Sequence, residues 1–192
     1  MFSPRRTRPS VSAPSLVLCS GGLDSTTIAT DLVAENEQVE LCFVDYGQPA
    51  TAAECRSVTA TAKRLGVGLC VLSVDGLAIP RAGEIAARNL TLIALAAAAR
   101  PTAPMIVIGI HSGTGYRDCS PAFVELMQEV LDFHSDGRCR LVAPFLTWSK
   151  PDVVALAVKL GVPIGLTHSC EAANEPCGEC QSCRDRDVLR AA

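Results

Sequence analysis

The stretch that decides the fold lies near the amino end and reads Leu16-Val17-Leu18-Cys19-Ser20-Gly21-Gly22-Leu23-Asp24-Ser25-Thr26-Thr27. Its first residues are apolar and predict a buried strand, and a helix is expected to begin at about Ser25. The two glycines let the backbone adopt positive φ and approach a ligand closely, so that successive N–H groups converge on one anion. The positive end of the helix dipole points at the same place. The stretch therefore predicts a strand, a phosphate-binding loop and a helix.

Asp24 lies inside this predicted loop. A bare carboxylate there would repel phosphate, so Asp24 is best explained as a ligand of a Mg²⁺ ion that bridges the two. We therefore predict an ATP site with these loop residues: Ser20, Gly21, Gly22, Leu23, Asp24, Ser25, Thr26 and Thr27. The alternative is a glycine-rich turn in which Ser25 is an ordinary helix N-cap.

Short apolar runs and helical patterns alternate along the rest of the chain. The expected strands are nearly continuously apolar, as strands buried on both faces are, and lie at 16–19, 39–45, 69–74, 105–110 and 141–145. The expected helices lie at 25–34, 50–65, 84–99, 121–133 and 150–160, with Gly66 and Gly161 as C-caps. This alternation predicts an α/β fold with a doubly wound, mostly parallel five-stranded sheet, whose ligands bind beyond the carboxyl ends of the strands.

Four cysteines near the carboxyl end form a second signal. Cys170, Cys177, Cys180 and Cys183 are spaced C-x6-C-x2-C-x2-C, and tight Cys-x2-Cys turns direct several sulfurs to one centre. Zinc is the first choice, an iron–sulfur cluster is the rival, and disulfides are a third alternative, although nothing indicates secretion. Four thiolates leave a metal no open position, so it is expected to hold a small lobe together.

Composition limits the domain organisation and the partners. The chain has 192 residues, 48% of them hydrophobic, and a net charge of −3. We expect a disordered tail at 1–14, an ATP-binding domain at 15–165 and a zinc-binding lobe at 166–192. The tail is basic and has no apolar segment behind it long enough for a signal peptide. The run 90–99 is too short to span a bilayer. A cytoplasmic protein without a basic surface for a large RNA is expected.

Five elements occur here in one order: the diglycine loop, Asp45-Tyr46-Gly47-Gln48, Arg88-Asn89, Gly115-Tyr116-Arg117-Asp118-Cys119 and the four cysteines. The loop resembles the PP-loop of the ATP pyrophosphatases, and the whole order resembles the 7-cyano-7-deazaguanine (preQ0) synthase family. The resemblance implies an adenine nucleotide alpha hydrolase-like fold and the cofactors ATP, Mg²⁺ and Zn²⁺. It implies a ligase that converts 7-carboxy-7-deazaguanine and ammonia to the nitrile. The acid and then the amide are adenylated, releasing pyrophosphate and AMP.

The resemblance also suggests roles for side chains. The catalytic candidates are Asp24, Lys150 and Arg88, and the expected substrate contacts are Tyr46, Gln48, Arg88, Asn89, Tyr116 and Asp118. Lys150 is expected to neutralise phosphate charge, with a solvated lysine as the alternative. Arg88 is suited to grip a carboxylate or phosphate, and Asp118 to accept from the guanidine-like edge of the base. An ordinary surface ion pair is the alternative for both. Tyr116 either stacks on the base or simply packs.

The chain departs from the family pattern on the substrate side. The segment between Asp75 and Arg88 is short, Ala87 replaces the usual Gly, and Arg117 replaces a Pro. One alternative is therefore a variant that stops at the amide or attaches a deazaguanine to DNA or protein. Others are a PP-loop tRNA sulfurtransferase that uses Cys119, and a non-catalytic nucleotide-binding partner. The expected partners are a small deazapurine acid and ammonia, without membrane or nucleic acid. A homodimer or a complex with a second protein stays open.

Overall fold

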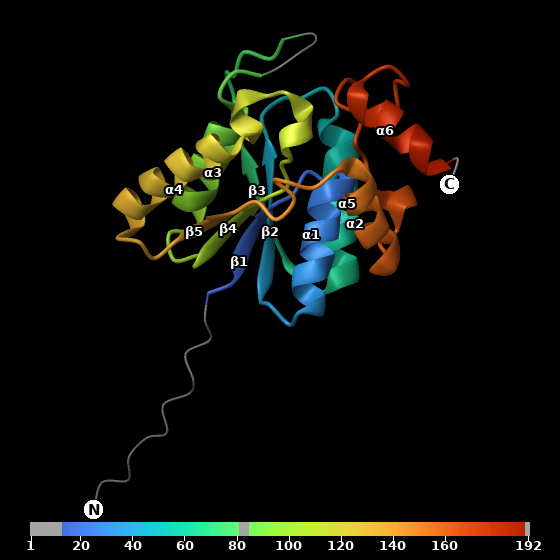
Figure 1. Ribbon diagram of the computed structural model, residues 1–192. Helices are drawn as coiled ribbons and strands as arrows, with labels where there is room; N and C mark the ends of the chain where they lie inside the picture. The colour runs from blue at the N-terminus through green and yellow to red at the C-terminus, as the bar shows by residue number, and fades with distance from the viewer. Residues whose placement is uncertain (1–12, 81–84, 191–192) are drawn as a thin grey trace, which may run out of the picture.

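The computed structural model describes residues 13–80 and 85–190 (Figure 1). The strands are β1 (Ser15–Leu18), β2 (Val39–Asp45), β3 (Gly68–Ser73), β4 (Met105–Ile108) and β5 (Arg140–Val142). The helices are α1 (Leu23–Ala34), α2 (Thr51–Leu65), α3 (Arg88–Ala99), α4 (Pro121–Ser135), α5 (Lys150–Lys159) and α6 (Gln181–Arg190). Short 3₁₀ turns lie at Ser112–Thr114, Arg117–Cys119 and Ile164–Leu166.

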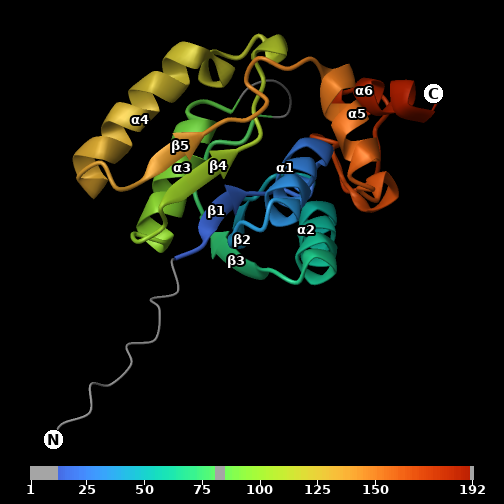
Figure 2. The same cartoon turned by 60° about the horizontal axis from the view of Figure 1, so that its bottom comes forward.

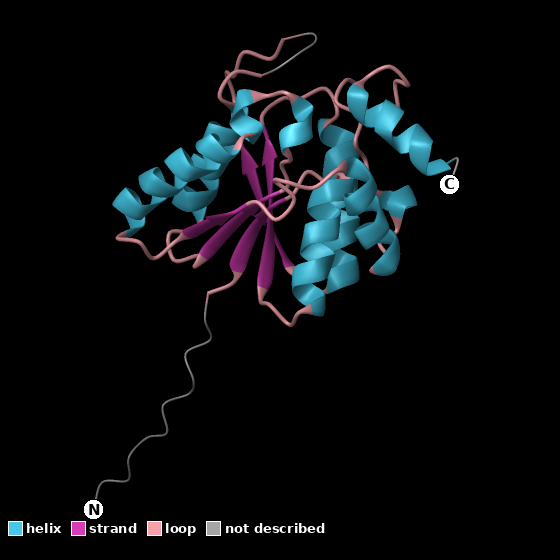
Figure 3. Cartoon of the chain, in the orientation of Figure 1, coloured by secondary structure: helices cyan, strands magenta, loops and turns pink. Residues whose placement is uncertain are grey.

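The five strands form one parallel sheet in the order β3-β2-β1-β4-β5. The chain moves outward from β1 through β2 to β3, then returns to the other side of β1 for β4 and β5. This reversal makes the sheet doubly wound, with its topological switch point between β1 and β4. The predicted fold class is confirmed. The loop after β1 lies at this switch point, at the carboxyl end of the strands, where Figure 3 shows loops gathered.

Helices cover both faces of the sheet (Figures 1 and 2). Side chains alternate along a strand, so neighbouring residues of β1 enter different cores. Leu16 packs in the core under α3 and α4, together with Ile93. Val17 packs in the core under α1, α2 and α5, together with Ile28 and Val153. All five side chains are buried, which explains why the strands read as continuous apolar runs.

Several element boundaries differ from the sequence prediction. Helix α1 begins at Leu23, with Gly22 as N-cap, and the Ser25 hydroxyl lies inside the helix and donates to the Gly22 carbonyl at 3.3 Å. The interpretation of Ser25 as the N-cap is therefore wrong. Gly66 is the C-cap of α2 as expected, whereas Leu160 is the C-cap of α5 and Gly161 follows it with φ +65°.

Other predicted ranges are corrected at their ends. Strand β4 ends at Ile108 and β5 spans Arg140–Val142, so both are shorter than expected. Helix α3 begins at Arg88, and Glu84 lies outside the described residues, as does 1–12 of the expected tail. Helix α6 follows directly on Cys180 and was not predicted, because its strongly polar sequence shows no apolar stripe. The division into an ATP-binding domain and a zinc-binding lobe stays a prediction.

Candidate functional site

The first glycine of the loop after β1 is required by the fold itself. Gly21 has φ +75°, a conformation that side chains disfavour, and a Cβ there would lie 2.5 Å from the Ser57 Cβ and 2.7 Å from the Val58 backbone nitrogen. Because Ser57 and Val58 belong to α2, the loop packs directly against that helix. No other residue fits this position without moving α2.

The second glycine has room around it. Gly22 has φ −71°, and a Cβ there would lie 3.5 Å from both the His168 carbonyl oxygen and the Ser20 Oγ, and 3.7 Å from the Ser169 Oγ. These are ordinary van der Waals distances, so protein packing alone does not demand glycine. The residue stands at the N-cap of α1, where first-turn N–H groups have no intrahelical acceptor. The space beside Gly22 is therefore suited to an anion.

An ion pair closes one side of this loop. The Lys150 Nζ lies 2.5 Å from the Asp24 Oδ1, and their side chains are 24% and 19% exposed. Lys150 is the first residue of α5, whose start is fixed by a reciprocal capping box between Ser149 and Asp152. The structure thus brings together Asp24 and Lys150 from distant parts of the chain. It places Lys150 against a carboxylate at the loop rather than in open solvent.

The residues after β2 form a hydrogen-bonded turn next to α2. The Gln48 Oε1 accepts from the Tyr46 backbone N–H at 2.9 Å, and its Nε2 donates to the Glu54 Oε2 at 2.7 Å and to the Val44 carbonyl at 3.2 Å. Burial raises the pKa of Tyr46 and of Glu54, and the nearby Arg88 guanidinium opposes both shifts. Arg88 therefore lies close to Tyr46 and Glu54, while the Gln48 amide is occupied by this turn.

The start of α3 is held by the 3₁₀ turn before α4. The Asp118 Oδ2 accepts from the Asn89 backbone N–H at 3.3 Å, and the buried Asn89 side chain donates to the Asp118 carbonyl at 3.1 Å. Ala87, just before α3, has φ +56°. No ion pair joins Arg88 to Asp118 in the described part of the chain. The surface-pair alternative is therefore wrong.

Cys119 and Tyr116 lie beside this turn. Tyr116 is half-buried and packs against the core under α3 and α4. Cys119 is buried, and burial raises the pKa of its thiol. A protonated, enclosed thiol is a poor nucleophile, which does not favour a sulfur carrier at this position.

The four predicted metal ligands converge. The Sγ atoms of Cys170, Cys177, Cys180 and Cys183 lie within 4.8 Å of one another, and all are free thiols. A tetrahedral Zn²⁺ with Zn–S bonds of about 2.3 Å needs sulfurs about 3.8 Å apart, and Cys177 and Cys183 are 3.9 Å apart. Backbone N–H groups of Cys180 and Glu179 donate to the Cys177 sulfur and lower its pKa to about 6. The donor set is compatible with one zinc ion.

The segment that carries these cysteines is attached to the loop and to α2. The His168 N–H donates to the Gly21 carbonyl at 2.9 Å, and the Leu23 N–H donates to the Ser169 Oγ at 3.4 Å. The Asn174 Oδ1 accepts from the Ala53 N–H at 2.8 Å and so caps the first turn of α2. The cysteine segment is therefore bonded both to the diglycine loop with the start of α1 and to α2, the helix against which that loop packs.

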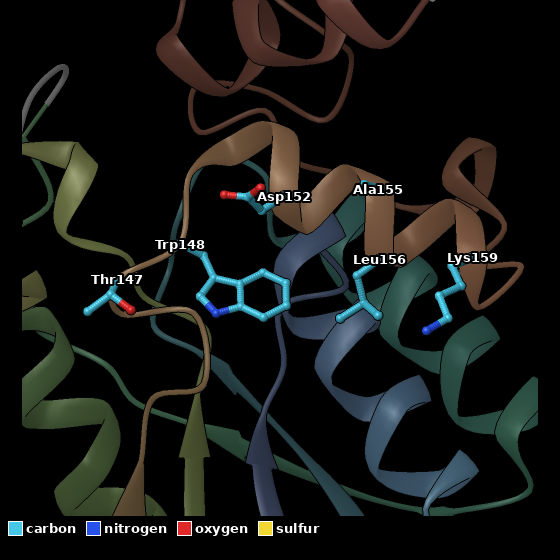
Figure 4. Close-up of a pocket in the computed structure, with 6 residues that line it drawn as sticks. All are labelled: Thr147, Trp148, Asp152, Ala155, Leu156 and Lys159. Carbon is cyan, nitrogen blue, oxygen red and sulfur yellow. The ribbon is translucent and has the colours of Figure 1, made fainter.

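A separate hollow lies beside α5. It has a volume of about 590 Å³ and is open to solvent, and it is lined by Thr147, Trp148, Asp152, Ala155, Leu156 and Lys159. Figure 4 shows the Trp148 indole between Thr147 and Leu156 among the lining side chains. The indole packs on Phe145, and the Asp152 carboxylate is bound to the Ser149 N–H at 3.0 Å. None of the predicted site residues lines this hollow.

Comparison with known proteins identifies the family. The sequence matches the family described as "Queuosine biosynthesis protein QueC" over residues 14–83 and 78–189. The chain belongs to the QueC family. It is 32% identical over 201 residues to the 7-cyano-7-deazaguanine synthase of Brucella ovis, covering 90% of this chain and 86% of the relative. The synthase of Allorhizobium ampelinum is 31% identical over 200 residues, covering 89% and 85%.

Solved structures agree with the fold of this QueC family member. NMN synthetase from Francisella tularensis aligns with a TM-score of 0.55 and 13% identity, covering 94% of this chain and 78% of that one. NH3-dependent NAD synthetase from Campylobacter jejuni aligns with a TM-score of 0.51 and 18% identity, covering 82% and 68%. At these identities the likeness concerns the fold alone. No helix in the described ranges has the length and apolar character needed to cross a bilayer.

Sequence reasoning missed several residues that shape this QueC site. Ser57 fills the place of a Gly21 side chain, Ser169 bonds the first amide of α1, and Asn174 caps α2. None of them belongs to a local motif used in the prediction. The one available signal is that His168 and Ser169 directly precede the first metal-ligand cysteine.

Proposed function

We propose that this protein is a 7-cyano-7-deazaguanine synthase, an ATP-dependent ligase that converts 7-carboxy-7-deazaguanine and ammonia to the nitrile. The observation that carries the proposal is the diglycine loop at the switch point of the sheet, with Gly22 at the N-terminus of α1 and the Asp24–Lys150 pair beside it. Membership of the QueC family and the names of the curated relatives supply the substrate class.

The nucleotide half of the reaction is assigned to the loop. The first-turn amides of α1 and the hydroxyls of Ser20 and Ser25 would hold the pyrophosphate portion of ATP. Asp24 would hold Mg²⁺, which when bound screens phosphate charge and orients the triphosphate. Lys150 would then move from the Asp24 carboxylate to a phosphate oxygen. These groups favour attack at the α-phosphorus because they stabilise the charge that develops on the leaving pyrophosphate.

The chemistry proceeds in two adenylations. A carboxylate oxygen attacks the α-phosphorus of ATP, pyrophosphate leaves, and ammonia then displaces AMP from the acyl carbon to give the amide. The amide oxygen attacks the α-phosphorus of a second ATP, and a second pyrophosphate and one N–H proton leave. Expulsion of AMP with loss of the other N–H proton then gives the nitrile. The protein's contribution is mainly to hold acid and nucleotide in line, because adenylation itself needs no protein nucleophile.

The acid is assigned to the edge formed by β2, α3 and the turn at Arg117–Cys119. Arg88 would bind its carboxylate, and Tyr46 and Tyr116 would border the base. Asp118 would accept from the guanidine-like edge through the Oδ1, because the Oδ2 already holds the Asn89 N–H. Gln48 and Asn89 would act by holding these loops in place.

The four-cysteine segment is assigned to Zn²⁺. Four thiolates leave the ion no open position, so it would stabilise the segment and take no part in the reaction. This role fits the segment's bonds to the diglycine loop and to α2.

Product analysis tests the proposal. The full chain is incubated with 7-carboxy-7-deazaguanine, ammonium, ATP and Mg²⁺, and the products are identified by mass spectrometry. The expected result is the nitrile, with AMP and pyrophosphate released in equal amounts, and about a hundredfold less product per unit time from Asp24→Asn. Accumulation of the amide alone would instead establish the shortened-pathway variant suggested by the short segment before Arg88. Unchanged acid with no AMP would refute ligase activity.

A further inference from the structure

The strap, defined as residues 167–170, joins the diglycine loop to the metal-ligand segment. Its backbone is bonded to the loop through the His168 N–H and the Gly21 carbonyl, and its side chain Ser169 accepts from the Leu23 N–H at 3.4 Å. Cys170, the next residue, is buried and is one of the four converging thiols. One short segment thus touches both the loop and the metal cluster.

Ser169 borders the space assigned to phosphate. A Cβ at Gly22 would lie 3.7 Å from the Ser169 Oγ and 3.5 Å from both the Ser20 Oγ and the His168 carbonyl oxygen, so both hydroxyls lie on the same side of Gly22. A serine hydroxyl has one donor and two acceptor positions. Ser169 uses an acceptor position for Leu23, and the bonds of the described residues include none donated by its own O–H. The Ser169 O–H is therefore available to donate to an anion beside Gly22.

The Leu23 amide is itself one of the first-turn groups that attract an anion. When phosphate oxygens bind beside Gly22, they compete with the Ser169 Oγ for the Leu23 N–H. The Ser169 Oγ then no longer accepts from the Leu23 N–H, and the Ser169 O–H donates to a phosphate oxygen. A neutral donor in this position adds a hydrogen bond to a charged oxygen, which is stronger than one between neutral groups.

We propose that Ser169 binds the polyphosphate of ATP, and that the metal cluster holds it in place through Cys170. This inference rests on the proposed function, because it adds a residue to the same nucleotide site. Since Ser169 and Cys170 are adjacent, restraint of the cysteine by zinc restrains the hydroxyl. By linkage, bound ATP must then also slow the loss of zinc.

The binding test uses the zinc-loaded full chain and isothermal titration with ATP, pyrophosphate and AMP. Ser169→Ala is expected to weaken ATP and pyrophosphate binding by about tenfold or more, the equivalent of one hydrogen bond to a charged group. AMP binding is expected to stay unchanged, because AMP lacks the β- and γ-phosphates. The matched control is Ser182→Ala, whose hydroxyl lies in the same segment but donates to the Glu171 Oε1 at 2.6 Å.

The outcomes separate this inference from the proposed function. If the unmodified protein binds neither ATP nor pyrophosphate, the proposed function itself fails. If it binds them and Ser169→Ala binds them equally well, only the role of Ser169 is refuted. An equal loss of AMP affinity, or a loss of zinc, would mean that the substitution acts on structure, and would refute a phosphate contact.

Zinc release tests the coupling. A chromogenic chelator is added to the zinc-loaded protein with and without ATP and Mg²⁺, and the rate of zinc transfer is followed. ATP is expected to slow release about fivefold in the unmodified protein and in Ser182→Ala, and to have no effect in Ser169→Ala. An unmodified protein that binds ATP yet releases zinc at the same rate would refute the coupling.

Discussion

The nucleotide side and the substrate side of the carboxyl edge are built differently. On the nucleotide side, Gly22 starts α1 without being required by packing, and the Asp24–Lys150 pair connects two charges that a ligand can separate. On the substrate side, the polar side chains of Gln48, Asn89 and Asp118 are bonded to neighbouring backbone groups. The nucleotide side thus holds its charges in an ion pair, whereas the substrate side holds its polar side chains on the backbone.

This difference assigns the two sides different tasks. The nucleotide loop lies between a buried strand and a helix and packs against α2 at Gly21, so its shape is fixed by packing. On the substrate side, side chain–backbone hydrogen bonds of Gln48, Asn89 and Asp118 hold the loops in shape. Under the proposed function, recognition of the acid would fall on few groups, with Arg88 the charged one near Tyr46 and Glu54.

The largest expected effect separates the two glycines of the loop. Gly21→Ala should destabilise the protein by at least about 3 kcal/mol, because strained φ and overpacking against α2 add together. Gly22→Ala should fold normally, since its Cβ meets only ordinary contacts, yet lose most ATP affinity. Thermal unfolding and ATP titration measure both. A Gly22→Ala variant that binds ATP normally would contradict the binding of phosphate beside Gly22.

The next effect concerns the charged pair on the nucleotide side. Asp24→Asn should reduce turnover by about a hundredfold or more, because loss of the Mg²⁺ ligand removes charge stabilisation from the transition state. Asp31→Asn, a change of the same kind further along α1, should leave turnover unchanged. Steady-state kinetics measures both variants. If Asp24→Asn turned over as fast as the unmodified protein, Asp24 would not be a Mg²⁺ ligand.

A smaller effect is expected on the substrate side. Arg88→Lys keeps the charge but loses bidentate geometry, so it should raise the KM for the acid about tenfold with little change in the KM for ATP. Arg117→Lys is the control, because Arg117 is exposed in the neighbouring 3₁₀ turn. If the KM for ATP rose instead, Arg88 would belong to the nucleotide side, and the two sides would no longer differ in this way.

The smallest effect tests strain before α3. Ala87 has φ +56°, so Ala87→Gly should raise the free energy of unfolding by about 0.5–1 kcal/mol, the relief of strain minus the added chain entropy. Ala86→Gly, which lacks positive φ, should lower it. Chemical denaturation measures both. A destabilised Ala87→Gly would mean that the backbone at Ala87 carries no strain that glycine relieves.

The sequence predicted features that depend on neighbouring residues. The apolar runs gave the sheet because strands buried on both faces leave no polar positions, and the cysteine spacing gave the metal ligands because tight turns bring sulfurs together. The start of α1 was displaced because Ser25 is a typical capping residue, whereas the extended backbone at Gly22 fills that role. Helix α6 was missed because a polar helix has no apolar period to detect.

Contacts between distant segments could not be predicted in this way. Leu23 and Ser169 are 146 residues apart, and Ala53 and Asn174 are 121 apart. Lys150 was identified through the resemblance, but its distance to Asp24 depends on how α5 packs on α1. Only the folded topology brings such groups to one edge.

The bond between the Leu23 amide and Ser169 has a consequence for biosynthesis. During translation the diglycine loop leaves the ribosome early, but its partner on the strap follows 146 residues later. The nascent chain therefore lacks the completed loop until almost all of it has been made. Under the proposed function, nucleotide would therefore be captured only at the end of synthesis, when the last cysteines have emerged as well.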